Sequence, residues 1–78
     1  MAVLEVLVFG QLTDSIGGDR IHLSYVQDTD LFRTAMNERF PGLRDKTFLL
    51  AVNQELVLGK RILNPGDTVA LLPPFSGG

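Results

Sequence analysis

A single segment of helical periodicity stands among short apolar runs, and this arrangement limits the possible folds more than any other feature of the sequence. Its apolar residues share one stripe of a helix: Leu31, Phe32, Ala35, Met36 and Phe40. Asp28-Thr29-Asp30 offers capping oxygens and a negative charge at the N-terminal end, and Pro41-Gly42 ends the segment. The sequence therefore predicts one amphipathic helix whose stripe packs on a sheet.

Five apolar runs predict the strands of that sheet, at residues 3–9, 20–25, 47–52, 56–58 and 68–72. The first run is apolar on both faces apart from Glu5, as is typical of a strand covered on both sides. The second run alternates, with Ile21, Leu23 and Tyr25 on one face, and therefore predicts a half-exposed strand. Residues 11–16 between them predict a turn or one helical turn, so the two runs form a hairpin with an enlarged loop.

The order β-β-α-β-β-β, with one crossover helix, predicts an α+β fold of the β-grasp type. The first and last runs are the most apolar, so we expect them to be neighbours in the centre of a mixed sheet of four to five strands. One main helix packs on one face of this sheet. We expect the domain to span residues 1–74 and a flexible C-terminal tail to span residues 75–78.

Composition argues against several classes of function. The 78 residues allow one small domain, and a net charge of −2 leaves no basic excess for phosphates, so no nucleic-acid partner is expected. The absence of cysteine and the single histidine, His22, argue against a zinc site and a thiol nucleophile. His22 lies on the alternating strand and is expected to face solvent. We expect no signal peptide or membrane span, and hence a cytoplasmic protein.

The C-terminal tail carries the chemistry of the sequence. Pro73 and Pro74 cannot continue a strand ladder, and they precede Phe75, Ser76, Gly77 and Gly78. Two glycines can pass through a narrow channel because they lack a Cβ. Adenylation of the terminal carboxylate with ATP would create a good leaving group, and a sulfur nucleophile could then form a thioester or thiocarboxylate. The alternative is that this tail is an ordinary frayed terminus.

Four segments make the sequence resemble a known family over essentially its whole length. They are Val-Leu-Val-Phe-Gly-Gln at residues 6–11, Leu-Ala-Val-Asn-Gln at 50–54, Pro-Gly-Asp-Thr-Val-Ala at 65–70 and Pro-Pro-Phe-Ser-Gly-Gly at 73–78. The chain resembles the small, sulfur-carrying subunits of molybdopterin synthase, which are ubiquitin-like β-grasp proteins. Phe75 departs from the family, where an aliphatic residue is more common, so the receiving channel must accept a ring.

The resemblance implies a sulfur-donating subunit that is not an enzyme on its own. An E1-like adenylyltransferase would activate the Gly78 carboxylate with MgATP, and a sulfurtransferase would provide the sulfur of a thiocarboxylate. The tail, with Gly77 next to its end, would enter the large catalytic subunit of the synthase, and the expected assembly is a heterotetramer. Two transfers would form the dithiolene of molybdopterin. The chain itself would bind no cofactor and no metal.

A carrier used by two enzymes needs a reusable docking surface, which we expect on the sheet face away from the helix. The candidate residues are Phe9, Leu58, Leu72, Pro73, Pro74, Phe75 and Ser76. For Phe9, Leu58 and Leu72 the alternative is an ordinary place in the core. An aromatic residue beyond two prolines, such as Phe75, indicates an interface anchor. Lys60 and Arg61 could meet an acidic partner, although solvated loop charges are the simpler interpretation.

Two other classes of function fit the same residues. One is a sulfur carrier or ubiquitin-like modifier of another pathway, such as thiamine synthesis, tRNA thiolation or protein conjugation. The other is a plain β-grasp binding module whose terminal glycines are incidental. The first shares the activation of Gly78 and differs in the sulfur acceptor, whereas the second predicts that both glycines are dispensable.

Overall fold

Five strands and one long helix make up the part of the chain that the structure describes, residues 2–74 of a computed structural model. The strands are β1 (Val3–Val8), β2 (Arg20–Ser24), β3 (Leu49–Val52), β4 (Glu55–Val57) and β5 (Thr68–Leu72). The helices are α1 (Leu12–Ile16), α2 (Thr29–Arg39) and the single 3₁₀ turn η1 (Pro41–Leu43). The predicted order of elements is confirmed, and α1 is the predicted helical turn.

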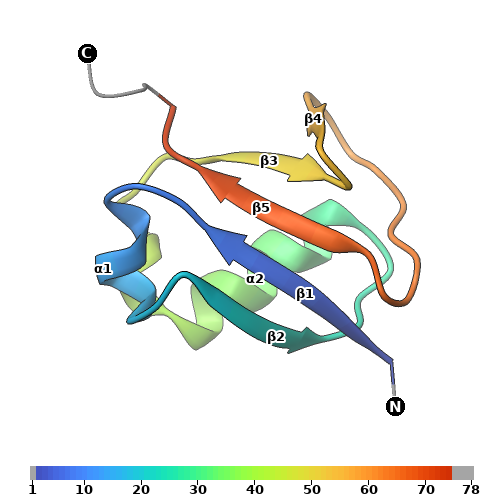
Figure 1. Ribbon diagram of the computed structural model, residues 1–78, viewed down its shortest axis with the longest axis horizontal. Coiled ribbons are helices and arrows are strands. Elements are labelled where there is room, and N and C mark those ends of the chain that lie inside the picture. Colours follow the sequence, from blue (N-terminus) through green and yellow to red (C-terminus); the bar gives the residue numbers. More distant parts are fainter. Residues whose placement is uncertain (1, 75–78) are drawn as a thin grey trace.

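The strands form one mixed sheet in the order β2-β1-β5-β3-β4 (Figure 1). β1 and β5 lie in parallel at its centre, and the other neighbouring pairs are antiparallel. This confirms the expectation that the first and last runs are central neighbours. The N-terminal and C-terminal strands are therefore joined directly, and the end of β5 is held by the middle of the sheet.

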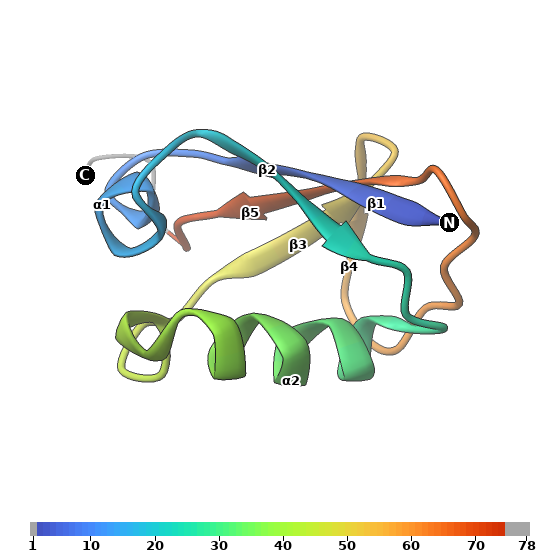
Figure 2. The same cartoon turned by 90° about the horizontal axis from the view of Figure 1, so that it is seen from below.

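Helix α2 runs along one face of the sheet, as Figure 2 shows from below. Asp28 caps it as predicted, since its Oδ1 accepts a hydrogen bond from the Leu31 amide at 2.9 Å. Thr29 is buried, and its Oγ1 accepts a hydrogen bond from the Arg61 amide at 3.0 Å. The helix ends at Arg39, before Pro41 as expected. No helix in residues 2–74 is long and apolar enough to cross a membrane.

The core lies between α2 and the sheet. Its fully buried side chains come from the inward positions of the central strands, from α2 and from the segments that close the ends. They include Leu4, Val6, Val69, Leu71, Leu50, Phe32, Met36, Leu43 and Leu63. Burial of each large apolar side chain contributes roughly 1.5–3 kcal/mol to folding. Among residues 2–74, no second layer packs on the opposite face of the sheet.

The expectation that the first strand is covered on both sides is wrong. Leu4, Val6 and Val8 face α2 and are buried, whereas Val3 is 44% exposed. Phe9, just after the strand, is 43% exposed. In the described chain no element covers the second face, so its apolar residues remain accessible to a partner.

The apolar stripe of α2 is narrower than predicted. Phe32 and Met36 are fully buried, and Ala35 and Phe40 are partly buried against the core. Leu31 is 47% exposed, contrary to its assignment to the stripe. Adjacent helical positions differ by about 100° around the axis, so Leu31 lies at the margin of the face that Phe32 occupies.

Two strands differ from their predicted bounds. β3 begins at Leu49 rather than residue 47, and β4 spans Glu55–Val57 rather than residues 56–58. The cause of the shift in β4 is the turn at Asn53 and Gln54, which both have positive φ (50° and 72°). Two such residues form the tight connection that suits the twist of a hairpin, so pairing resumes at once with Val52 opposite Glu55.

Candidate functional site

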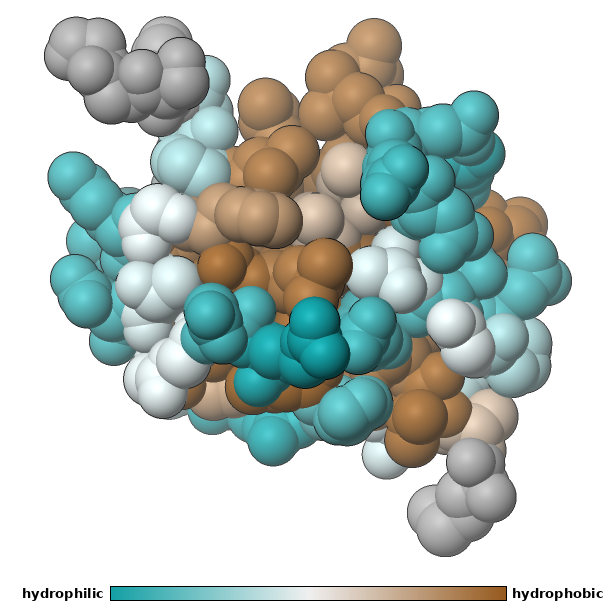
Figure 3. Space-filling model, viewed as in Figure 1, coloured by the Kyte–Doolittle hydropathy of each residue, from teal (hydrophilic) through white to brown (hydrophobic). Residues whose placement is uncertain are grey.

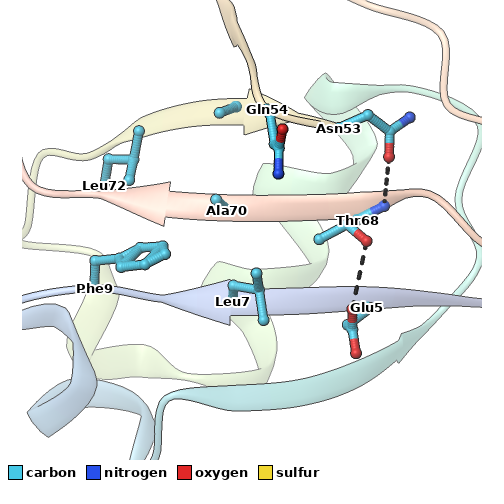
Figure 4. Close-up of a pocket in the computed structure, with 9 residues that line it drawn as sticks. Glu5, Leu7, Phe9, Asn53, Gln54, Thr68, Ala70 and Leu72 are labelled. Carbon is cyan, nitrogen blue, oxygen red and sulfur yellow. Dashed lines mark hydrogen bonds between the residues drawn. The ribbon is translucent and has the colours of Figure 1, made fainter.

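A groove of about 660 Å³ lies on the sheet face away from α2 (Figure 4). Its residues come from β1, β5 and β3, from the residue after β1, and from the turn that follows β3. They are Glu5, Leu7, Phe9, Ala51, Asn53, Gln54, Thr68, Ala70 and Leu72. The groove is thus built from the central strands, whose positions are fixed by the core on the other face.

Two alanines create the hollow. Ala70 on β5 pairs with Leu7 on β1 on one side and with Ala51 on β3 on the other. Side chains in such a row point to the same face of a sheet. Because both central positions carry only a methyl group, the surface is lower there than at the flanking Phe9 and Leu72, and a partner side chain can enter.

The groove has an apolar part and a polar end. Hydrophobic surface gathers over the middle of the sheet (Figure 3). The apolar part of the groove lining consists of Leu7, Phe9, Ala70 and Leu72 (Figure 4). The neighbouring cross-strand row, two residues before Leu7 and Ala70, is polar. In this row Glu5 pairs with Thr68, and the Thr68 amide donates a hydrogen bond to Asn53 Oδ1 at 3.0 Å. The groove can therefore receive an apolar ridge that carries a polar group at one end.

Asp67 fixes the turn beside this polar end. Its Oδ2 accepts from the Asn64 amide at 2.9 Å and its Oδ1 accepts from Asn53 Nδ2 at 3.1 Å. The hydrogen bond from the Asn64 amide, followed by that from Asn53, lowers the pKa of Asp67 below its ordinary value. Asn53 thereby links the β3–β4 turn to the loop that precedes β5.

The chain leaves the sheet over the β1–α1 connection. Gly10 has φ +61°, and a Cβ on it would lie 2.9 Å from Cγ of Pro73. The Phe9 amide donates to the Leu71 carbonyl at 3.1 Å, and the Gly10 carbonyl accepts from Thr13 Oγ1 at 2.9 Å. Pro73 therefore rests on a hydrogen-bonded turn at the end of the groove that Phe9 and Leu72 line.

The structure brings together only some of the predicted docking residues. Phe9 and the half-buried Leu72 both line the groove, and neither belongs to the core cluster. Leu58 is 88% exposed but lies beyond β4, outside the groove lining. Pro73 is half-buried and Pro74 exposed. Their roles in binding stay predictions, and those of Phe75, Ser76, Gly77 and Gly78 concern residues outside the described range.

Sequence reasoning missed most of the lining, although period-2 alternation could have found it. Leu7 and Glu5 precede Phe9 by two and four residues, and Ala70 and Thr68 precede Leu72 in the same way. Once one residue on a strand is assigned to the groove face, every second residue of that strand belongs to the same face. Ala51 follows from its pairing with Ala70, which the sequence does not reveal.

Other charged candidates have partners inside the chain. Lys60 Nζ lies 3.8 Å from Asp28 Oδ2, and the Arg61 guanidinium pairs with Glu55.

His22 is exposed, as expected. Within residues 2–74, no three histidine or acidic side chains gather in a way that could hold a metal ion.

Comparison with known proteins gives consistent matches along the whole chain. The model of the ThiS family matches residues 6–78. The chain is 35% identical to the human molybdopterin synthase sulfur carrier subunit, over 96% of this chain and 93% of that protein.

Solved structures with the same fold include small archaeal modifier protein 1 of Haloferax volcanii. Its TM-score is 0.82 at 22% identity, over 97% of this chain and 99% of that one. A chain of the complex of subunits 1 and 2 of molybdopterin-converting factor from Helicobacter pylori is also similar. Its TM-score is 0.73 at 26% identity, over 97% of this chain and 99% of that one.

Proposed function

The chain belongs to the ThiS family, and we propose that it is the sulfur carrier subunit of molybdopterin synthase. The observation that carries the proposal is the match itself, which runs to residue 78 and so includes Gly77 and Gly78. The full-length similarity to the human sulfur carrier subunit supports this pathway over the others that use the same fold.

In the proposed reaction, the Gly78 carboxylate attacks the α-phosphorus of ATP, held with Mg²⁺ by an E1-like adenylyltransferase. Pyrophosphate leaves and an acyl adenylate forms. A sulfur nucleophile at the oxidation level of sulfide, provided through a sulfurtransferase, then displaces AMP and leaves a thiocarboxylate. Two such carriers in turn supply the two sulfur atoms of the dithiolene, and each returns to the carboxylate form. The carrier contributes the sulfur and the docking surface, and the large subunit contributes the catalytic side chains.

We further propose that the large subunit covers the groove between Phe9 and Leu72. Two observations support this placement. The groove lies near Pro73, where the chain leaves the sheet, so a protein bound there is close to the residue from which the tail continues. The related Helicobacter pylori structure is a complex of subunits 1 and 2 of its factor. A heterotetramer, with two carriers on a dimer of large subunits, is the expected assembly.

Reconstitution tests the proposal directly. The thiocarboxylated chain is mixed with its large subunit and the cyclic pterin precursor, and molybdopterin is measured as its fluorescent oxidation product. Deletion of Gly78, or one residue added after it, is expected to abolish product formation while the circular dichroism spectrum stays unchanged. The matched control is Gly59→Ala, because a Cβ at this exposed loop position meets nothing within 4 Å. Product formation by either tail variant would contradict the proposal.

A further inference from the structure

We propose that Glu5 selects the partner that fills the groove, by pairing with a lysine or arginine that this partner places at the polar end. This proposal rests on the proposed function only for the identity of the partner, the large synthase subunit. The partner surface that fits the groove is an apolar ridge with one basic side chain beside it.

Glu5 is the single ionisable residue among the nine that line the groove in the described chain. It lies on β1, two residues before Leu7, and Figure 4 shows it at the end of the row formed with Thr68. Two residues of a strand span roughly 7 Å, which sets the distance between the apolar row and the charge that a partner must match.

The Glu5 carboxylate is only loosely satisfied by its own chain. Thr68 Oγ1 donates to Oε1 over a long 3.4 Å, and Arg20 Nη1 lies 3.6 Å from Oε2. The Arg20 side chain is 63% exposed, whereas that of Glu5 is 33% exposed. His22, opposite Glu5 on β2, is also exposed. A carboxylate has about four lone-pair sites, so water must satisfy most of those on Glu5.

A partner that covers the groove removes this water. A carboxylate that loses its hydration without gaining a counter-charge weakens binding, so a partner with a neutral or acidic ridge is disfavoured. A basic side chain at this place replaces the water with a charge-assisted hydrogen bond. Glu5 therefore discriminates among partners whose apolar ridges would fit equally well into the hollow over Ala51 and Ala70.

The test is the dissociation constant of the whole chain for its large subunit, measured by calorimetry at two salt concentrations. Glu5→Gln is expected to weaken binding by at least about tenfold and to reduce the dependence of binding on salt. Glu5→Lys is expected to weaken it further. The matched control is Glu38→Gln, which removes the charge of an exposed glutamate on α2, away from the groove.

A second variant distinguishes a cation on the partner from Arg20 as the counter-charge of Glu5. Arg20→Gln should leave binding unchanged or tighten it, because Arg20 competes for Glu5. Equal weakening by Arg20→Gln and Glu5→Gln would mean that the counter-charge is internal, and it would overturn the inference. So would normal binding by Glu5→Gln. Failure of the wild-type chain to bind the large subunit would instead contradict the proposed function, so the two failures are distinguishable.

Discussion

Among the glycines of the described chain, Gly10 has the least room for a side chain. Its φ is +61°, and a Cβ added to it would lie only 2.9 Å from Cγ of Pro73. A left-handed conformation costs an L-residue roughly 1–2 kcal/mol. We expect Gly10→Ala to lower the free energy of unfolding by about 1–2 kcal/mol in urea denaturation. Gly59→Ala should leave it within about 0.5 kcal/mol, since its Cβ meets nothing.

The double variant Gly10→Ala, Pro73→Ala provides the control for the contact. Alanine at residue 73 removes the Cγ that the new methyl group would meet. Part of the lost stability should therefore return in the double variant. An additive loss would show that backbone strain alone explains the effect and that Pro73 does not rest on Gly10.

Asp67 makes stability depend on acid pH. Because its folded-state pKa lies below the ordinary 3.8, its stabilising contribution is complete above that pH and is lost as pH falls through the folded value. Asp67→Asn should lower the free energy of unfolding by up to about 1 kcal/mol at pH 7. The gap between variant and wild type should shrink below about pH 3.8 in urea titrations. A gap that stays constant with pH would contradict the role of the carboxylate charge.

At the scale of elements, α2 packs on the sheet through few fully buried side chains. Phe32 is fully buried whereas its neighbour Leu31 is 47% exposed. Phe32→Ala should cost about 3–5 kcal/mol, because it leaves a cavity at the centre of the core. Leu31→Ala should cost less than about 1 kcal/mol. Thermal and urea denaturation of the pair tests the assignment, and similar losses for both variants would contradict it.

The elements themselves were largely predictable from the sequence. Periodicity places α2, and capping and proline chemistry at Asp28 and Pro41 place its ends within a residue or two. The runs of β1 and β5 predict their central position. The faces of β1 were not predictable, because an apolar residue that packs in the core and an apolar residue that stays exposed follow the same sequence pattern. Phe9 is the example: it is apolar and yet 43% exposed.

The groove was less predictable than the fold because it depends on strand pairing. Phe9 and Leu72 were candidates from their chemistry, but the hollow needs Ala51 opposite Ala70, and register is a property of the folded sheet. Leu58 shows the same limit, since β4 ends one residue before it, at Val57.

At the scale of the whole molecule, we propose that the two faces of the sheet have separate roles. One face packs on α2 and stabilises the fold. If the other face binds the large subunit, filling the groove should affect binding and leave stability unchanged. Ala70→Trp fills the hollow without touching the core, and we expect at least tenfold weaker binding to the large subunit with a melting temperature close to wild type. Thr34→Trp, on the exposed side of α2, is the control for added aromatic surface. Unchanged binding by Ala70→Trp would move the docking site elsewhere.

The intact mass of the chain tests most directly whether Gly78 carries sulfur. The chain is incubated with MgATP, its E1-like adenylyltransferase and a sulfide source, and its mass is then measured. We expect an increase equal to the replacement of one oxygen by sulfur, located at Gly78 by fragmentation. An unchanged mass, with an enzyme shown to be active on its own carrier, would contradict the claim and favour a plain binding module.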